Sequence, residues 1–514
     1  MLDNSSNNKR IAQNTLLLYV RMLFLMLVSL YTSRTILIAL GVEDYGIYNV
    51  VGGIVTMFQM FSGSLTAAIT RFITYELGTN NSNKLKSVFS ASVTIQILLS
   101  GFIILFAETI GLWFLNEKMT IPTDRVFATH WVYQFSVITF TINLISVPYN
   151  AAIIAHEKMA AFAYIGIIDA IGRLIIAFMV MYSPFDCLIY YGFLMCILAV
   201  SIRFLYTKYC KKNFEECEYH FIWNKYLLKE IFTFAGWNFI GSTSAILREH
   251  GGNILINMFF GPTVNAAKGI SAQVNSAVSA FTNNFMTAVQ PQITKSYASG
   301  NSTYMLSLLF QSIRYSFYLL LILTLPIFLR TNYILNIWLK EVPDYTDIFI
   351  QLTLVFTLCE AMSHPLVTAM LATGKIRNYQ IIVGGIQMMN LPISYILLKL
   401  KFDAPCVLIT SIIISQCCLV ARLIMLRPLI GLNILFFIKD VYLNMIVVGG
   451  VSLMFPLWIN TYLSQNTMGF FTVSLISFLS TMTTIFILGC NTKERLFIIS
   501  KVNAITHKKW PHND

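Results

Sequence analysis

The chain has 514 residues, of which 56% are hydrophobic and only 11% are charged, and its mean hydropathy is +0.68. Soluble domains carry about 25% charged residues, so this composition excludes an ordinary soluble globular protein. The formal net charge of +12 would suggest nucleic-acid binding in a soluble chain. In a membrane protein, basic loops on one side produce the same excess, so we expect no nucleic-acid partner.

Apolar runs of roughly 20 residues, each long enough to cross a bilayer, follow one another through almost the whole chain. The predicted spans cover about 15–40, 46–75, 86–115, 127–153, 160–182, 185–208, 231–257, 264–292, 304–329, 347–372, 378–399, 403–426, 437–460 and 467–489. We therefore predict an all-α integral membrane protein with about fourteen transmembrane helices.

Basic residues are shared unequally between the two sets of loops. One set contains Lys84, Lys86, Lys158, Lys208, Lys211, Lys212, Lys225, Lys229, Lys295, Lys375, Arg377 and Arg427. The opposite loops contain few bases and several acids, namely Glu43, Asp44, Glu341 and Asp344. Because Lys and Arg collect in cytoplasmic loops, we predict that both termini are cytoplasmic.

Two segments share the pattern P-x-x-x-A-x-x-A-x-x-K. They run from Pro148 to Lys158 and from Pro365 to Lys375, each at the end of an apolar run. A second ungapped match lays residues 40–88 over 260–308 and pairs Gly41 with Gly261. Since an even number of predicted spans separates the copies, the repeat is parallel, with its pseudo-twofold axis along the membrane normal.

The repeat predicts a domain organisation of two pseudo-symmetric six-helix bundles, followed by two C-terminal helices. The expected boundaries are 1–210 for the N-terminal bundle, 211–224 for a cytoplasmic connection, 225–430 for the C-terminal bundle, 431–490 for spans 13 and 14, and 491–514 for a basic cytoplasmic tail.

Several segments together resemble a known family. LGVEDYGIYNVVGGI at 40–54, the two P-x-x-x-A-x-x-A-x-x-K segments, FFGPTVNAAKGI at 259–270 and PQITKSYASGN at 291–301 are similar to Wzx-type polysaccharide flippases. These belong to the MOP superfamily, together with the MATE drug exporters and the lipid II flippases. The resemblance covers about Lys9 to Leu426 and is weaker in the last two spans.

The resemblance implies a MATE-like, V-shaped pair of bundles around a central cavity. It also implies a substrate, an undecaprenyl-diphosphate-linked oligosaccharide moved from the inner to the outer leaflet of the bacterial inner membrane for O-antigen-like or capsule-like surface polysaccharide. Membrane lipids and other proteins of polysaccharide assembly are the partners that it implies.

Charged residues inside apolar spans are the candidate substrate-binding groups, because a charge at the centre of a membrane helix costs about 2.5–3.5 kcal/mol. The candidate cations are Arg34, Arg71, Arg248 and Lys268, in the first two predicted spans of each half. Such cations would neutralise a lipid diphosphate, and the planar fork of arginine suits phosphate. Arg71, like Arg21, lies near the end of its span, where snorkelling to headgroups would also explain it.

Three further residues are candidates for ion coupling. Glu249 follows Arg248 directly, and a cation on a neighbouring span would explain it equally well. Glu360 and His364 stand at i,i+4 just before Pro365, where they would bind a coupling proton or sodium ion or simply lock the kink. Asp169 and Arg173 have the same spacing, and an intrahelical ion pair is sufficient to explain them.

Enzyme motifs are missing from the sequence. It has no G-x-x-x-x-G-K-[ST] and no H-E-x-x-H, and its nine cysteines lack metal-ligand spacing, so we expect neither an enzyme nor a cofactor. A membrane glycosyltransferase or polymerase remains an alternative, with Glu43 and Asp44 as its outer acids, although the outer loops are short. A cation-coupled MATE-type drug exporter is the other alternative, but a cavity for cationic drugs should be lined by acids.

The loop charges generate a test of orientation. Cysteine introduced at Lys211 should be cytoplasmic, and cysteine at Glu341 should be outside. An impermeant maleimide added to intact cells should therefore label only the second variant. Labelling at position 211 would overturn the orientation.

Overall fold

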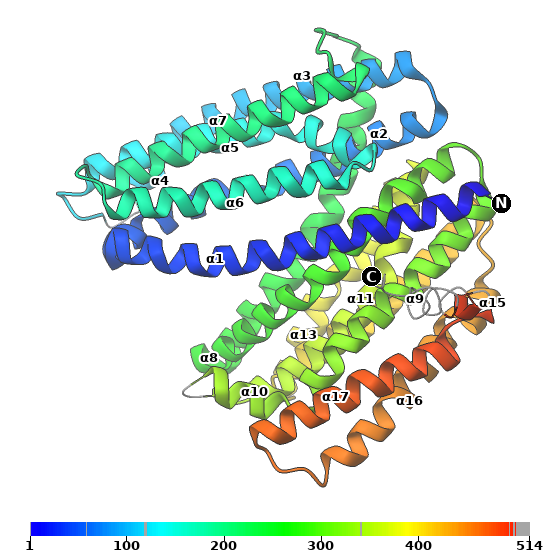
Figure 1. Ribbon diagram of the computed structural model, residues 1–514. Helices are drawn as coiled ribbons and strands as arrows, with labels where there is room; N and C mark the ends of the chain where they lie inside the picture. Colours follow the sequence, from blue (N-terminus) through cyan, green and yellow to red (C-terminus); the bar gives the residue numbers. More distant parts are fainter. Residues whose placement is uncertain are drawn as a thin grey trace, which may run out of the picture. The chain divides into compact units, whose positions relative to one another are not determined.

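The computed structural model describes residues 2–57, 59–117, 121–339, 342–492, 494–496 and 499. Within these residues the chain is helical and contains no strand (Figure 1). Glu341 and nearly all of the predicted basic tail lie outside the described residues. The all-α prediction is confirmed.

The helices follow one another with short connections. Their bounds are α1 Leu2–Met57, α2 Gln59–Thr79, α3 Ser82–Phe106, η1 Ala107–Gly111, α4 Leu112–Glu117, α5 Val126–Ala155, α6 Met159–Met181, α7 Cys187–Asn213, η2 Glu215–Cys217, α8 Lys225–Ala298, α9 Ser302–Leu329, α10 Thr331–Trp338, α11 Thr346–Thr373, α12 Arg377–Met388, α13 Asn390–Lys399, α14 Cys406–Ile430, α15 Ile434–Phe436, η3 Phe437–Tyr442, α16 Leu443–Asn460, α17 Thr467–Thr484 and η4 Ile485–Gly489.

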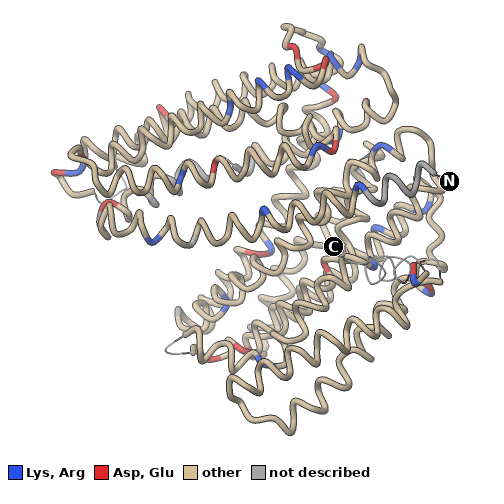
Figure 2. The backbone as a smooth tube through the Cα atoms, in the orientation of Figure 1, with Lys and Arg blue, Asp and Glu red and all other residues tan. Residues whose placement is uncertain are grey.

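Eleven helical segments among the described residues are long and apolar enough to cross a membrane. Long stretches of these helices carry no charge (Figure 2). The remaining predicted spans, about 46–75, 231–257 and 264–292, are helical in their described parts but do not meet the same criterion. The predicted number of fourteen is therefore not confirmed, and the three exceptions include the spans of Arg71, Arg248 and Lys268.

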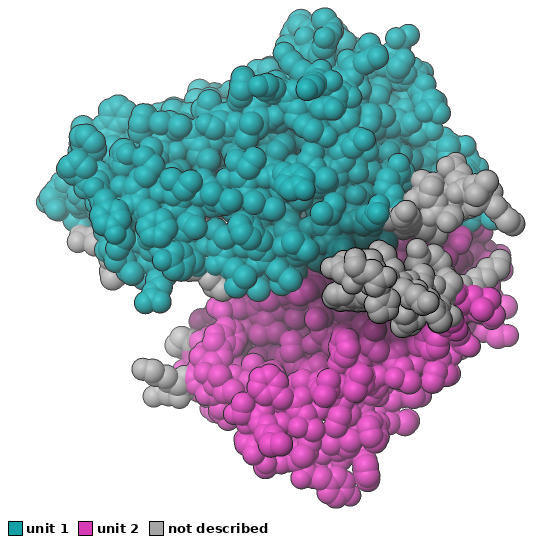
Figure 3. Space-filling model, viewed as in Figure 1, with its two compact units in different colours: residues 1–245, 287–305, 368–384 teal, residues 246–286, 306–367, 385–514 magenta. Residues whose placement is uncertain are grey.

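The chain divides into two compact units, coloured separately in Figure 3. Unit 1 comprises residues 1–245, 287–305 and 368–384, and unit 2 comprises residues 246–286, 306–367 and 385–514. Unit 1 thus holds α1 to α7 together with parts of α8, α9, α11 and α12. The predicted boundaries of the two six-helix bundles stay a prediction.

Each unit is held together by apolar faces of neighbouring helices. In unit 1, α1 packs along α6 and α5 packs along α7, around a buried core that includes Val132, Tyr133 and Ile176. In unit 2, α16 and α17 pair side by side (Figure 1). Burial of this kind, rather than helix propensity, fixes which helices are neighbours.

The backbone repeats its irregular points at the aligned positions. Gly41 interrupts α1 with φ 75° and ψ 171°, and its partner Gly261 interrupts α8 with φ 79° and ψ −175°. This region of conformational space is essentially open to glycine alone. The next turns repeat as well, because Asn80 and Gly300, which align in the same match, both have positive φ. The P-x-x-x-A-x-x-A-x-x-K segments share the feature too, with φ 59° at Glu157 and 74° at Gly374.

The two kinks generate a stability prediction. A Cβ at Gly41 or Gly261 would meet no atom within 4 Å, so Gly41→Ala and Gly261→Ala should destabilise through backbone strain alone, by about 1–3 kcal/mol each. Unfolding by sodium dodecyl sulfate in mixed micelles measures this loss. Gly101→Ala in α3 and Gly269→Ala in α8 are matched controls at helical glycines that are equally open. Equal stability of all four variants would contradict the assignment of strain.

Candidate functional site

A pair of opposite charges lies inside unit 2. Arg248 Nη1 on α8 is 3.8 Å from Glu360 Oε1 on α11, and the two side chains are 13% and 20% exposed. The guanidinium also lies over the Phe356 ring, 4.8 Å from its centroid. Arg248 Nη1 is buried and has no hydrogen-bond partner among the described residues. The pair is thus an ion contact that leaves part of the arginine fork unsatisfied.

A third helix completes the surroundings of Glu360. Ser415 on α14 donates a hydrogen bond of 2.5 Å to Glu360 Oε1. Glu360 also interacts electrostatically with Arg422 and His364. The carboxylate of Glu360 thus interacts with His364 at i,i+4, and Arg248 and Ser415 reach it from two other helices.

Sequence reasoning missed Arg422. Its side chain is 3% exposed on α14, a helix apolar enough to span a membrane. The rule that singled out Arg248, a charge inside an apolar run, applies equally to Arg422. Residues from α8, α11 and α14 therefore build one charged cluster, which comprises Arg248, Glu360, His364, Ser415 and Arg422.

Lys268 and Glu249 lie close to this cluster. Lys268 is half-buried beyond the Gly261 kink of α8, and it interacts electrostatically with Glu249 and Arg248. Glu249 is exposed and forms no ion pair within 4.0 Å among the described residues. The structure thus brings five of the predicted residues, Arg248, Lys268, Glu249, Glu360 and His364, into one region of unit 2.

Arg34 belongs to unit 1, whereas the residues around Arg248 belong to unit 2. It lies on the apolar part of α1, its side chain is exposed, and it forms no ion pair within the described residues. A bare cation inside a spanning segment must face a polar space or a lipid headgroup. Arg34 therefore remains a candidate by its position in the span.

Arg71 is not simply extended toward headgroups. Its Nη2 donates a hydrogen bond of 3.2 Å to the carbonyl oxygen of Ala372, inside the second P-x-x-x-A-x-x-A-x-x-K segment. The guanidinium lies 4.7 Å from the ring centroids of both Phe72 and Tyr75. Arg71 therefore belongs to unit 1, where this hydrogen bond ties it to the end of α11.

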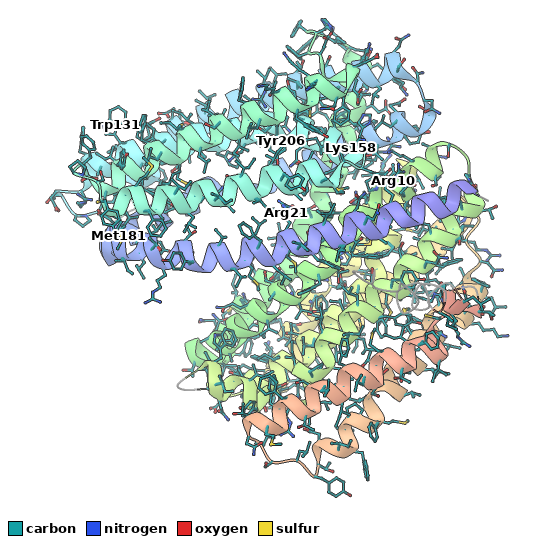
Figure 4. The ribbon with its side chains drawn as sticks, in the orientation of Figure 1. Arg10, Arg21, Trp131, Lys158, Met181 and Tyr206 are labelled. Carbon is teal, nitrogen blue, oxygen red and sulfur yellow. The ribbon has the colours of Figure 1, made fainter. Side chains whose placement is uncertain are left out.

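The first P-x-x-x-A-x-x-A-x-x-K segment ends in a buried acid that sequence reasoning also missed. The Glu157 side chain is 0% exposed and pairs with Arg10 Nε and Lys295 Nζ, both at 2.8 Å. Gln292 donates to the same carboxylate at 2.6 Å. The only sign of Glu157 in the sequence was its charged neighbour Lys158. Lys158 is itself exposed and lies at the same end of unit 1 as Arg10 (Figure 4). Glu157 therefore fastens α1 and the end of α8 to the turn between α5 and α6.

The residue before Glu157 fixes the connection after α7. The His156 ring stacks on Phe214 with centroids 4.0 Å apart, and His156 Nε2 contacts Glu216 Oε1. Burial alone would raise the pKa of Glu216, but the hydrogen bond with His156, a backbone hydrogen bond and the electrostatic effects of His156 and Lys86 together hold that pKa below its usual range. The connection is thereby anchored against the end of α5.

Asp44, the acid that we predict to lie on the outer side, has a structural partner. Arg125, at the start of α5, forms a bidentate ion pair with Asp44. The same guanidinium binds Asp186 at 2.7 Å, and Asp186 caps α7. Arg125 thus ties α1, at Asp44, to the starts of α5 and α7, whereas the side chain of Glu43 lies outside the described residues.

A polar cavity of about 350 Å³ lies within unit 1 between α1, α5, α6 and α7. Arg21 and Tyr206, labelled in Figure 4, line it together with Asp169 and Arg173. The predicted intrahelical pair is confirmed, since Arg173 Nε lies 3.0 Å from Asp169 Oδ2. Arg21 lies over the Phe162 ring at 4.2 Å, so it stacks inside the unit.

With these charges placed, comparison with known proteins identifies the family. The family model described as "Polysaccharide biosynthesis protein" matches residues 11–297, which is more than half of the chain. The chain belongs to this family. The resemblance to Wzx-type flippases of the MOP superfamily is thereby confirmed. A comparison with proteins of curated function gives no match.

Solved transporters share the fold. A multidrug resistance MATE transporter of the MOP superfamily in an outward-facing conformation has 12% identity, covers 83% of this chain and 96% of its own, and has a TM-score of 0.71. A MATE transporter of Vibrio cholerae has 15% identity, 83% and 99% coverage and a TM-score of 0.68. A MOP superfamily transporter of Pyrococcus furiosus has 13% identity, 83% and 96% coverage and a TM-score of 0.67. The polysaccharide biosynthesis protein is therefore a multi-pass membrane transporter with a MATE-like fold.

The Arg248–Glu360 contact can be tested by a double-mutant cycle. Arg248→Met or Glu360→Gln alone should destabilise by about 1–3 kcal/mol, because each leaves a poorly solvated partner. The double variant should lose less than the sum of the two. Unfolding by sodium dodecyl sulfate in mixed micelles gives the three values.

A second cycle on Arg173→Met and Asp169→Asn is the matched control. That pair is 48% and 32% exposed, so its coupling should stay below about 0.5 kcal/mol. An equally small coupling for Arg248 and Glu360 would contradict a direct ion contact.

Proposed function

We propose that this polysaccharide biosynthesis protein flips an undecaprenyl-diphosphate-linked oligosaccharide from the inner to the outer leaflet. The observation that carries the proposal is the incompletely satisfied guanidinium of Arg248, which lies inside unit 2 against α11, a helix apolar enough to span a membrane. Its only ion partner among the described residues is at 3.8 Å, and one of its buried nitrogens has no hydrogen-bond acceptor. An unmet donor on a buried cation favours an anionic ligand, and phosphate oxygens match the spacing of the guanidinium nitrogens.

The balance of charge around Arg248 supports the same conclusion. Arg248, Arg422 and Lys268 are three cations, against the carboxylates of Glu249 and Glu360. Arg34 adds an exposed cation in α1. A lipid diphosphate crossing hydrocarbon with its charge bare would be prohibitively costly, and an excess of cations along its route reduces that cost.

A drug exporter is the alternative that the fold neighbours suggest. A cavity for cationic drugs requires acids, whereas the described cluster has a cationic excess. The Pyrococcus furiosus neighbour is described by a reverse polarity of its binding pocket that suggests a different function. Transporters of this fold with different pocket charges are thus known, and the family match favours a polysaccharide precursor here.

A glycosyltransferase or polymerase is the other alternative. Its required outer acid would be Asp44, but Arg125 occupies both oxygens of that carboxylate. An acid engaged in this way is poorly placed to act as a catalytic base. The transport reading therefore needs no enzymatic step by this chain.

We further propose alternating access of two six-span bundles in the bacterial inner membrane, with both termini cytoplasmic. Glu249, Glu360 and His364 are the proposed coupling residues. Glu360 would exchange Arg248 for a proton or sodium ion when the substrate phosphate binds the arginine, because one cation cannot serve both anions fully. The partners would be the lipid-linked oligosaccharide, membrane lipids and other proteins of polysaccharide assembly.

Replacement of the cations tests the function directly. Arg248→Ala or Arg34→Ala should reduce transport roughly ten- to a hundredfold, since each loses a charge-assisted hydrogen bond of about 1.5–3 kcal/mol. Lysine at either position should rescue only partly, because it keeps the charge without the fork. The measurement is accumulation of undecaprenyl-linked oligosaccharide in the inner leaflet at equal expression.

Arg427→Ala is the control, because Arg427 is exposed in the last turn of α14 and should leave transport unchanged. Full transport by the Arg34→Ala/Arg248→Ala double variant would contradict the proposal that these cations bind the diphosphate during transport. A shifted pH optimum in Glu360→Gln, with the cation requirement retained, would support the coupling role.

A further inference from the structure

A second cavity, of about 630 Å³, lies wholly within unit 1 at the meeting point of α2, the start of α8 and the turn between α11 and α12. Its volume falls in the range of roughly 300–1,000 Å³ that is typical of small-molecule sites. Lys229, Lys375 and Arg377 at its edge belong to the loops and helix ends that we predict to be cytoplasmic. The cavity is therefore placed at the membrane surface from which a substrate would enter.

The lining is strongly basic. Four cations, Arg71, Lys229, Lys375 and Arg377, face one acid, Glu230. Lys229, Lys375 and Arg377 are exposed, and none of them forms an ion pair within the described part of the chain. Arg71 is half-buried, and its Nε has no hydrogen-bond partner in the same part. Such an uncompensated group of cations favours an anion.

The backbone is shaped for the approach of Arg71. A Cβ at Gly374 would come within 2.6 Å of Arg71 Nη2, and φ at Gly374 is 74°, so a side chain there would strain the backbone and displace the guanidinium. The next helix, α12, begins at Arg377, and Arg377 and Asn378 line the cavity. Free N–H groups in the first turn of a helix favour negative charge. The basic side chains and the N-terminus of α12 thus both favour an anion in the cavity.

Aromatic rings form the rest of the wall. Phe72 and Phe234 are buried and meet edge to face with centroids 5.8 Å apart. The guanidinium of Arg377 lies over the Trp237 ring, 5.4 Å from its centroid. Tyr226 is 79% exposed at the start of α8. Exposed Tyr and half-buried Trp are typical of the headgroup level, where one side of the ring is apolar and the other is hydrated. The ligand is therefore expected to combine phosphate with a lipid anchor.

We propose that this cavity is a loading site, distinct from the Arg248 cluster, that docks the phosphate groups of a membrane lipid before transport. On the proposed function, on which this assignment rests, that lipid is the diphosphate-linked glycolipid. Its two phosphates meet Arg71, Lys229, Lys375 and Arg377, and its first sugars lie against Tyr226 and Trp237. An anionic phospholipid headgroup offers the same phosphate chemistry with less charge.

Binding to the purified full-length protein, measured by native mass spectrometry, separates these lipids. The probes are farnesyl diphosphate, which carries a diphosphate on a short prenyl chain, and phosphatidylglycerol. The cavity variant is Lys229→Ala/Lys375→Ala/Arg377→Ala. The matched control is Lys208→Ala/Lys211→Ala/Lys212→Ala, which removes three exposed bases of α7 that do not line the cavity.

Farnesyl diphosphate should bind the cavity variant about tenfold more weakly or worse, and the control as well as the native chain. Equal losses in both triple variants, or none in either, would overturn the site. Equal affinity of the native chain for phosphatidylglycerol, with the same loss in the cavity variant, would overturn its assignment to a diphosphate lipid. Because binding is measured without transport, its failure is distinguishable from failure of the Arg248 and Arg34 experiment.

Discussion

Burying a charged side chain away from water is costly unless the charge is paired and hydrogen-bonded, and this cost decides how the buried ions of the protein are arranged. The cost is offset most completely at Glu157, because its buried carboxylate is bound by Arg10, Lys295 and Gln292. The cost is offset only in part at Arg248, because Glu360 is 3.8 Å away and one buried nitrogen has no hydrogen-bond partner among the described residues. The first arrangement fastens helices together, whereas the second leaves binding capacity for an anion.

The internal repeat shows how one backbone plan supports both uses. Glu157 and Gly374 occupy equivalent places in the two P-x-x-x-A-x-x-A-x-x-K segments, and both have positive φ. At the first place the acid binds α1 and α8 through Arg10 and Lys295. At the second, the absence of a side chain lets Arg71 approach the backbone. The same turn thus carries a buried acid that binds two helices in the first copy of the repeat, and it forms part of the wall of a basic cavity in the second copy.

The predicted cations belong to different compact units of the chain. Arg248 and Lys268 belong to the charged region of unit 2, with Glu249 and Glu360 close by. Arg71 stacks on aromatic rings within unit 1 and lines the basic cavity there. We propose that these places act in sequence on one anionic lipid, first by docking its phosphates and then by carrying them across. The acids near Arg248 make its affinity adjustable, which a transporter needs for release.

The sequence by itself determined the helical membrane fold and the MOP family, because hydropathy, motif spacing and repeat are local properties of the chain. It also determined that Gly41 and Gly261 are equivalent and that Asp169 pairs with Arg173 one turn away. Only the tertiary structure decided that Glu360 meets Arg248 and Ser415, and that Arg71 meets Ala372. These partners come from distant helices, and their contacts depend on how helices rotate and pack. Hydropathy reports that a residue lies in a span but not which neighbour its side chain faces.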